Sequence, residues 1–156
     1  LEAVRATGKP IILSTGMATL AEIAQAENAL WDDDLTLLHC TSAYPCPIEQ
    51  VNLRAMLELR DTFRTPVGYS DHTLGITVAI AAAAMGASVI EKHLTLDRAA
   101  VGPDHLSSIE PHDFRVMVRA IRTVEEALGD GIKRVQKSEE PLRSLWHEPT
   151  ATDSPS

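Results

Sequence analysis

The chain has 156 residues, enough for one domain with a sizeable core. Apolar residues make up 44% and charged residues 23%, a composition typical of a soluble globular protein. The formal net charge is −8, which argues against nucleic acid or an anionic membrane as the main partner, because such binding needs a basic face. A small phosphorylated ligand stays possible, since it needs only a few local donors.

The two cysteines, Cys40 and Cys46, lack the spacing of a zinc or redox motif, so the sequence predicts a protein of the reducing cytoplasm. The longest apolar run, residues 76–85, is too short to cross a bilayer. The first residues show no signal-peptide pattern and no initiator Met, as expected of a mature form, a trimmed form or a piece of a longer protein.

Four short apolar runs, each followed by a polar turn and a helical pattern, predict four consecutive βα units. The runs do not alternate strictly between apolar and polar residues, as expected of strands covered on both faces. Such units predict a parallel sheet with right-handed crossovers. The predicted strands are residues 10–16, 35–41, 66–70 and 87–93.

The predicted helices carry recognisable end signals. Thr19 and Glu22 form a capping box that opens a helix reaching about residue 30, and Asn52 is the predicted cap of the second helix. The Ala-rich residues 75–85 form the third helix. The fourth begins near Pro111 and carries an apolar stripe as far as residue 128.

Two α/β architectures fit four βα units: a complete open sheet, or the C-terminal half of a (β/α)₈ TIM barrel. In the second case two strand edges and one apolar face need partners from further sequence. We expect residues 1–131 to form the partial barrel. We expect residues 132–156, which have no clear apolar period, to be a linker or disordered tail.

Polar residues gather where each predicted strand ends, at the edge of a parallel sheet where ligands bind. We call this end of the sheet the mouth. His72 and His93 end neighbouring strands there, and Asp71 and Glu91 flank them. Two imidazoles with a nearby carboxylate suit a divalent metal with positions left open for substrate. The alternative is that each histidine only forms hydrogen bonds within its own loop.

Serines recur at the same place in successive units. Ser14, Ser42 and Ser70 can hold a phosphate or a carboxylate, although serine also favours turns for local reasons. Tyr44 either lines a sugar pocket or packs over a strand end. Asp104 belongs to a Gly-Pro-Asp-His turn, where it binds ligand or simply caps the bend.

Three other polar positions are predicted to be structural. Lys92 alternates with His93, so it is expected to face the helices or to pair with a carboxylate. No base activates Cys40 or Cys46, which argues against a cysteine nucleophile. His39 lies within the second predicted strand and is interpreted as structural.

Six motifs occur in the order in which the sialic acid synthase family has them, and the chain resembles that family over most of its length. The family includes N-acetylneuraminate, legionaminate and pseudaminate synthases and a spore-coat polysaccharide relative. The resemblance implies a (β/α)₈ barrel of which these strands are the fifth to eighth. The motifs are STGM at 14–17, HCTSAYP at 39–45, GYSDHT at 68–73, EKHLT at 91–95, GPDH at 102–105 and SIEP at 108–111.

The resemblance also implies roles for residues at the mouth. Family metal ligands for manganese or magnesium correspond to His72 and His93, and serines that bind phosphoenolpyruvate correspond to Ser14 and Ser70. Ser42 stands where some members carry an Asn that contacts phosphoenolpyruvate. The sugar-contacting positions of the family correspond to Tyr44 and Asp104, and Asp104 joins the two histidines as a catalytic residue.

The implied reaction condenses phosphoenolpyruvate with an N-acylated hexosamine to give a nine-carbon 2-keto sugar acid and phosphate. The resemblance implies a homodimer of the longer enzyme, with no antifreeze-like domain in residues 132–156. It also implies that this chain alone is inactive, because the family's phosphate-binding basic residues belong to the other half of the barrel. The alternatives are another phosphoenolpyruvate-condensing barrel synthase and a non-catalytic half-barrel.

Overall fold

The computed structural model describes residues 1–30 and 34–146, apart from the side chain of Ser144. Between residues 11 and 128 its strands and helices alternate as the sequence predicted, whereas the short helices at residues 2–5 and 140–146 were not predicted. In chain order the regular elements are α1 (Glu2–Arg5), β1 (Ile11–Ser14), α2 (Leu20–Leu30), β2 (Leu35–Cys40), the 3-10 turn η1 (Ile48–Gln50), α3 (Arg54–Phe63), β3 (Val67–Asp71), α4 (Thr77–Ala84), β4 (Ile90–Lys92), α5 (Pro111–Leu128) and α6 (Glu140–Trp146).

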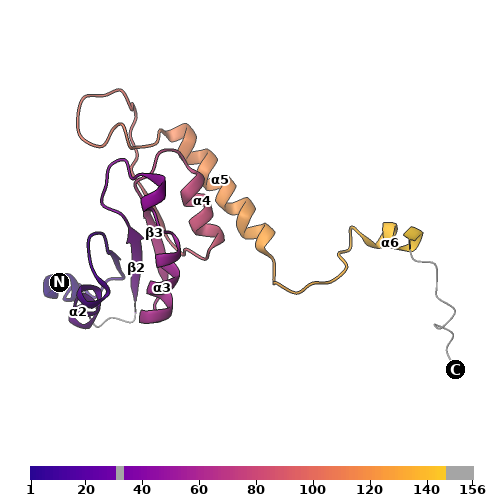
Figure 1. Cartoon of the computed structure of the whole chain (residues 1–156), viewed down its shortest axis with the longest axis horizontal. Coiled ribbons are helices and arrows are strands. Elements are labelled where there is room, and N and C mark those ends of the chain that lie inside the picture. Colours follow the sequence, from indigo (N-terminus) through magenta and orange to yellow (C-terminus); the bar gives the residue numbers. More distant parts are fainter. Residues whose placement is uncertain (31–33, 147–156) are drawn as a thin grey trace.

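The four strands form one parallel sheet in the order β1-β2-β3-β4. The register pairs Cys40 with Ser70, and Ser70 with Glu91. All strands therefore end at the same side of the sheet, where the β4–α5 loop projects beyond the helices (Figure 1). The predicted parallel sheet of four βα units is confirmed.

One face of the sheet is covered by helices and forms the main core. Residues of odd number in β2 and β3 point to this face, because side chains alternate along a strand. They pack against apolar residues of α2 and α3, which the 3.6-residue period places on one stripe of each helix. The buried side chains of this core include Ile23, Leu30, Leu35, Leu37, Met56, Leu59, Val67 and Tyr69.

The opposite face of the sheet is less covered. Ile12 on β1 is 56% exposed, whereas Leu38 on β2 is fully buried. Leu38 packs into the space left by Gly68, where a Cβ atom would lie 2.6 Å from Leu38 Cδ2. Within the described residues β1 and β4 each have one edge without a strand partner. This face and these edges are the surfaces that a half-barrel leaves open.

The helix ends follow local sequence in most places. The capping box is confirmed, because Thr19 N–H and Oγ–H donate to Glu22 and the Glu22 N–H donates to Thr19 Oγ1. The predicted cap at Asn52 is wrong. Asn52 has φ of +47°, and α3 begins after Leu53 without a side-chain cap.

The C-terminal part of the described chain leaves the sheet. α5 packs along α4, and an extended segment then leads to α6, which stands apart from the strands (Figure 1). α6 is a short helix within residues 132–156, which the sequence predicted to be a linker or tail; residues 147–156 of that segment lie outside the described part. Across residues 1–30 and 34–146, no helix combines the length and the apolar character needed to cross a bilayer.

Candidate functional site

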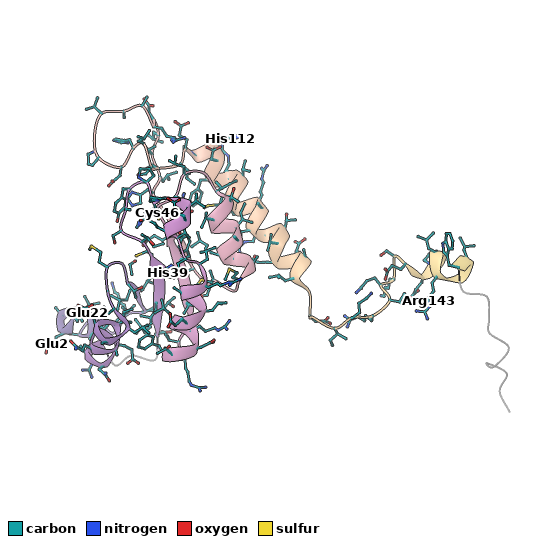
Figure 2. All side chains as sticks on the ribbon, in the orientation of Figure 1. Glu2, Glu22, His39, Cys46, His112 and Arg143 are labelled. Carbon is teal, nitrogen blue, oxygen red and sulfur yellow. The ribbon has the colours of Figure 1, made fainter. Side chains whose placement is uncertain are left out.

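The strand ends divide their polar side chains between the two faces of the sheet. Side chains alternate along β3, so Ser70 and His72 point to the face of the sheet opposite the helices, at its mouth end. Asp71 lies between them and points to the helix-covered face. Glu91 and His93 alternate with Lys92 in the same way. In Figure 2, Cys46 and His112, which follow β2 and β4, lie toward the end of the molecule to which β2 points.

The imidazole rings of His72 and His93 meet at the mouth. Their centroids are 5.3 Å apart and their planes cross at 79°. His72 follows β3 and is 6% exposed, whereas the side chain of His93, after the edge strand β4, is 34% exposed. The sequence-based expectation that two neighbouring strands bring these rings together agrees with this geometry.

His72 is oriented by the loop after β2. Its Nδ1 lies 2.8 Å from the carbonyl oxygen of Thr41, so this nitrogen carries the proton and donates to Thr41. The other ring nitrogen, Nε2, then presents a lone pair toward the mouth. Ser70 Oγ lies 3.4 Å from this Nε2. The main-chain carbonyl of His72 also accepts a bond from the Cys46 N–H at 2.8 Å.

Tyr44 covers both imidazoles. Its ring centroid lies 4.2 Å from that of His72 and 5.5 Å from that of His93. The residue is nevertheless 50% exposed. Tyr44 therefore belongs to the same group as the two histidines and forms one wall beside them.

Ser70 and Glu91 form a second contact at the mouth. The Ser70 hydroxyl donates to Glu91 Oε1 at 2.6 Å, across the register pair that joins β3 to β4. This bond leaves the other carboxylate oxygen of Glu91 available on the same face as the imidazoles. Of the two acidic residues that flank the histidines in sequence, Glu91 is thus the one beside them in space.

Asp71, by contrast, is turned away from the mouth. Its carboxylate pairs with the Lys92 ammonium at 2.9 Å, and both side chains are fully buried. Of the two carboxylates that flank the histidines in sequence, Asp71 therefore does not lie beside them, because strand alternation places it on the other face of the sheet. Lys92 is expected to face the helices or to pair with a carboxylate, and the structure shows both.

Asp104 approaches from the β4–α5 loop. Its Oδ2 lies 3.9 Å from His93 Nδ1, and its side chain is 46% exposed. The residue has φ of +67°, and its main-chain carbonyl accepts bonds from the hydroxyls of Ser107 and Ser108. The loop thus holds Asp104 at the rim of the site, facing the more exposed histidine.

Ser14 and Ser42 lie over the first two strands instead of beside the imidazoles. Ser14 ends β1, is exposed, and has Leu38 as its register partner. Ser42 lies close to Gly16 and Cys40: a Cβ atom at Gly16 would be 2.2 Å from Ser42 Oγ and 2.8 Å from Cys40 Sγ. Gly16 thus makes room for the Ser42 hydroxyl.

The cysteines are not nucleophiles. Burial raises the pKa of the Cys40 thiol, and burial also raises the pKa of the Cys46 thiol. Both are therefore protonated near neutral pH, in agreement with the sequence-based exclusion of cysteine chemistry. His39 is structural as expected, since its Nε2 lies 2.8 Å from the carbonyl oxygen of Val51.

The donor set at the mouth fits a divalent metal held by few protein ligands. His72 has the proton on Nδ1 and a carbonyl partner for it, the arrangement that orients a metal-binding imidazole. In the described ranges no group of three or more His, Cys, Asp or Glu side chains is close enough to hold a metal. A metal here would have His72 and His93 as its protein ligands and would take further oxygens from water or substrate.

Two contributions to the site had no signal in the sequence. The carbonyl oxygen of Thr41 orients His72, and main-chain atoms carry no residue-specific pattern. Thr73, which is fully buried, binds the Asp71 carboxylate through its N–H at 2.9 Å and its hydroxyl at 2.7 Å. An Asp-x-Thr spacing is compatible with such a turn, but only the fold shows that Lys92 joins it.

Comparison with solved structures supports the half-barrel. The sialic acid synthetase of Leptospira borgpetersenii serovar Hardjo-bovis superposes with a TM-score of 0.82 at 36% identity, covering 94% of this chain and 54% of that one. A spore coat polysaccharide biosynthesis protein of Bacillus subtilis gives a TM-score of 0.78 at 33% identity, covering 87% of this chain and 40% of that one. The four parallel strands with their helices are thus half of a (β/α)₈ barrel, as predicted.

Comparison with sequences gives the family. The N,N'-diacetyllegionaminic acid synthase of Campylobacter jejuni is 50% identical over 145 residues, which cover 90% of this chain and 43% of the relative. Human N-acetylneuraminate-9-phosphate synthase is 41% identical over 139 residues, covering 86% of this chain and 38% of the relative. The chain therefore spans less than half the length of these relatives. Residues 1–133 match the NeuB family model, and the chain belongs to the NeuB family.

Proposed function

We propose that the chain forms the metal-binding half of a nonulosonic acid synthase, acting with four further βα units. The reaction is the condensation of phosphoenolpyruvate with an N-acylated hexosamine. Family membership supports an enzyme of this kind, since similar chains are named as legionaminic acid, pseudaminic acid and N-acetylneuraminate-9-phosphate synthases. The proposed place of action is the cytoplasm, and the proposed assembly is a homodimer of the longer enzyme.

The proposed reaction joins three carbons to six. C3 of phosphoenolpyruvate forms a bond to the aldehyde carbon of the open-chain sugar, and the aldehyde oxygen becomes a hydroxyl by taking up a proton. Water adds to C2, and the bond from C2 to the phosphate oxygen breaks. The products are a nine-carbon 2-keto acid and inorganic phosphate, with the second proton of water released to solvent or phosphate.

The residues at the mouth would share the work of binding these two substrates. Ser14 would donate a hydrogen bond from its hydroxyl to phosphoenolpyruvate, and Ser70 would do so in exchange for its bond to Glu91, with Ser42 nearby over β2. Tyr44 would pack against the sugar, and Asp104 would accept bonds from sugar hydroxyls. Both lie at the solvent-facing rim, where a polar ligand can exchange water contacts for contacts with the protein.

The observation that carries the proposal is that the ring centroids of His72 and His93 lie 5.3 Å apart, while Nδ1 of His72 is hydrogen-bonded to the Thr41 carbonyl oxygen. Manganese or magnesium bound there would supply Lewis-acid polarisation of the aldehyde oxygen. The part of this chain is to hold both imidazoles in the orientation that binds a cation, and to keep the sugar aldehyde and C3 of phosphoenolpyruvate close together.

The proposal can be tested with a chimera that joins the remaining half-barrel of the Campylobacter jejuni legionaminic acid synthase to this chain. Phosphate release from phosphoenolpyruvate is measured with an N-acylated hexosamine and Mn²⁺. We expect release by the chimera, none by the 156-residue chain alone, and none by the His72→Ala chimera. His112→Ala is the matched control, because His112 is exposed at the start of α5, and it should keep activity.

Three results would contradict the proposal. Metal-dependent release by the His72→Ala chimera would remove the metal assignment. Release by the isolated chain would show that no second half is needed. Release with four- or five-carbon aldehydes, but not with N-acylated hexosamines, would instead favour the phosphoenolpyruvate-condensing synthases of shorter keto acids.

A further inference from the structure

A buried ion pair lies directly behind the two histidines. The Lys92 ammonium is 2.9 Å from Asp71 Oδ2, and both side chains are 0% exposed. Asp71 immediately precedes His72, and Lys92 immediately precedes His93. Because side chains alternate along a strand, the ion pair occupies the helix-covered face while the imidazoles occupy the mouth. The same two strand ends therefore carry an ion pair on one face and an imidazole pair on the other.

Thr73 closes this ion pair into a network of three residues. The other Asp71 oxygen, Oδ1, accepts bonds from the Thr73 N–H and hydroxyl, and Lys92 also donates to the Thr73 carbonyl. The residues before and after His72 are thus both bound by one ammonium group. We call Asp71, Thr73 and Lys92 the clamp.

The clamp is the main side-chain tie across this end of the β3–β4 pair on the helix-covered face. β4 has only three residues, and within the described part of the chain it forms the edge of the sheet. His72 has ties of its own, through the Thr41 carbonyl and the Cys46 N–H. Besides its ring contacts, His93 has a carbonyl that accepts from the Ile109 N–H and a 3.9 Å approach of its ring to Asp104. Loss of the clamp should therefore displace His93 more than His72.

Burying two charges is costly, and an apolar pair of similar volume often stabilises a fold as well or better. A buried ion pair is therefore weak evidence of a purely stabilising role. A role in fixing the geometry of the two strand ends explains its presence better. In the described residues every buried side-chain polar atom has a hydrogen-bond partner, so the clamp is fully satisfied. A satisfied polar network fixes distances more narrowly than apolar contacts do, because hydrogen bonds are directional.

We propose that Asp71, Thr73 and Lys92 are positioning residues that set the distance between the imidazoles of His72 and His93 from the reverse face of the sheet. The inference rests on the proposed function in taking that distance to serve metal binding. The geometric part, that the clamp holds His93 beside His72, stands on the contacts alone.

The main test uses the double variant Asp71→Asn/Lys92→Met in the full 156-residue chain. It removes both charges together, so neither is left buried without a partner. The introduced asparagine keeps an oxygen for Thr73, and the introduced methionine keeps most of the length of the lysine side chain. The matched control is Leu30→Ala, which creates a cavity at a fully buried position on α2, away from the clamp.

Two readouts are measured on the wild type, the double variant and the control. The first is the set of NMR contacts between ring protons of Tyr44, His72 and His93. The second is the affinity for Mn²⁺, followed by electron paramagnetic resonance. In the double variant we expect the His72–His93 contact to be lost, the Tyr44–His72 contact to remain, and Mn²⁺ to bind about 10–100-fold more weakly, the usual effect of removing support behind a metal ligand. The control should match the wild type in both.

The outcomes separate this inference from the proposed function. If the double variant keeps the His72–His93 contact, or if the control loses it equally, the clamp proposal is wrong. If the wild type shows the contact and the double variant loses it while neither binds Mn²⁺, the clamp stands and the metal assignment fails. Should the double variant not fold, Thr73→Val is used instead, because it keeps the ion pair and removes only the bond from the Thr73 hydroxyl to Asp71. It should weaken Mn²⁺ binding by less than the fold-change expected of the double variant. Ring contacts unchanged from those of the wild type would overturn the proposal.

Discussion

Gly68 occupies a position in β3 where a single added carbon should disturb the whole site. A Cβ atom there would lie 2.4 Å from the carbonyl oxygen of Val89 and 2.6 Å from Leu38 Cδ2. The first of these atoms belongs to the main chain and cannot rotate away. Gly68→Ala should therefore push the segment that leads into β4 away from β3 by at least about 0.6 Å to reach the shortest tolerated separation.

The expected cost follows from the contacts at this point. Overpacking of a core costs about 1–3 kcal/mol, and weakening the 2.9 Å bond from Tyr69 N–H to the Val89 carbonyl adds about 0.5–1.5 kcal/mol. Replacing glycine returns about 0.4–1 kcal/mol by restricting the unfolded chain. We expect Gly68→Ala to lower the free energy of unfolding by about 0.5–4 kcal/mol, compared with a usual total of about 5–15 kcal/mol.

Gly16→Ala is the matched comparison. Its Cβ would also be too close to neighbours, but these are Ser42 Oγ and Cys40 Sγ, the ends of side chains that can rotate. Urea unfolding followed by circular dichroism measures both variants. Gly68→Ala should lose more stability than Gly16→Ala and should bind Mn²⁺ more weakly, because β4 carries His93. Equal stability of the two variants would refute the reasoning from backbone contact.

Two further predictions concern the core behind the site. Met56→Ala on α3 should lower the free energy of unfolding by about 2–5 kcal/mol, because the side chain is fully buried against the sheet, whereas Ile48→Ala, 63% exposed, should change it by less than about 0.5 kcal/mol; the same urea titration checks both. Burial, and then the nearby Asp71 charge, raises the pKa of Tyr69 well above its ordinary value near 10. The folded state thus disfavours the phenolate, so this contribution to stability is complete below pH 10 and is lost as pH rises above it. Tyr69→Phe should flatten the fall of stability above about pH 10, and an unchanged slope there would contradict the assignment.

The local patterns in the sequence predict most of the strands and helices, but they do not predict all of the residues at which these begin and end. Apolar runs and the capping box of Thr19 and Glu22 place β1 and α2, because these signals act within a few residues. Asn52 is not the helix cap that the sequence suggests, since its side chain type suits a cap but its backbone takes φ of +47° in the turn before α3. The sequence does not predict α6, because a seven-residue helix offers too little apolar period to detect.

The sequence predicts which residues belong to the candidate site better than it predicts how their side chains are arranged. Motif order and strand-end position point to His72, His93, Tyr44 and Asp104, and these residues lie together. The role of Asp71 is not predictable, because one residue of register decides which face of the sheet a side chain takes.

The sequence by itself determined the succession of strands and helices between residues 11 and 128, the family resemblance and most of the residues that reach the mouth, because each depends on local spacing or on motifs read along the chain. Only the tertiary structure decided that Thr41 orients His72, that Gly68 admits Leu38, and that Lys92 ties together the residues on both sides of His72. These are contacts between strands whose residues are about 20–30 positions apart, and their distances depend on sheet register and packing, which no local pattern contains.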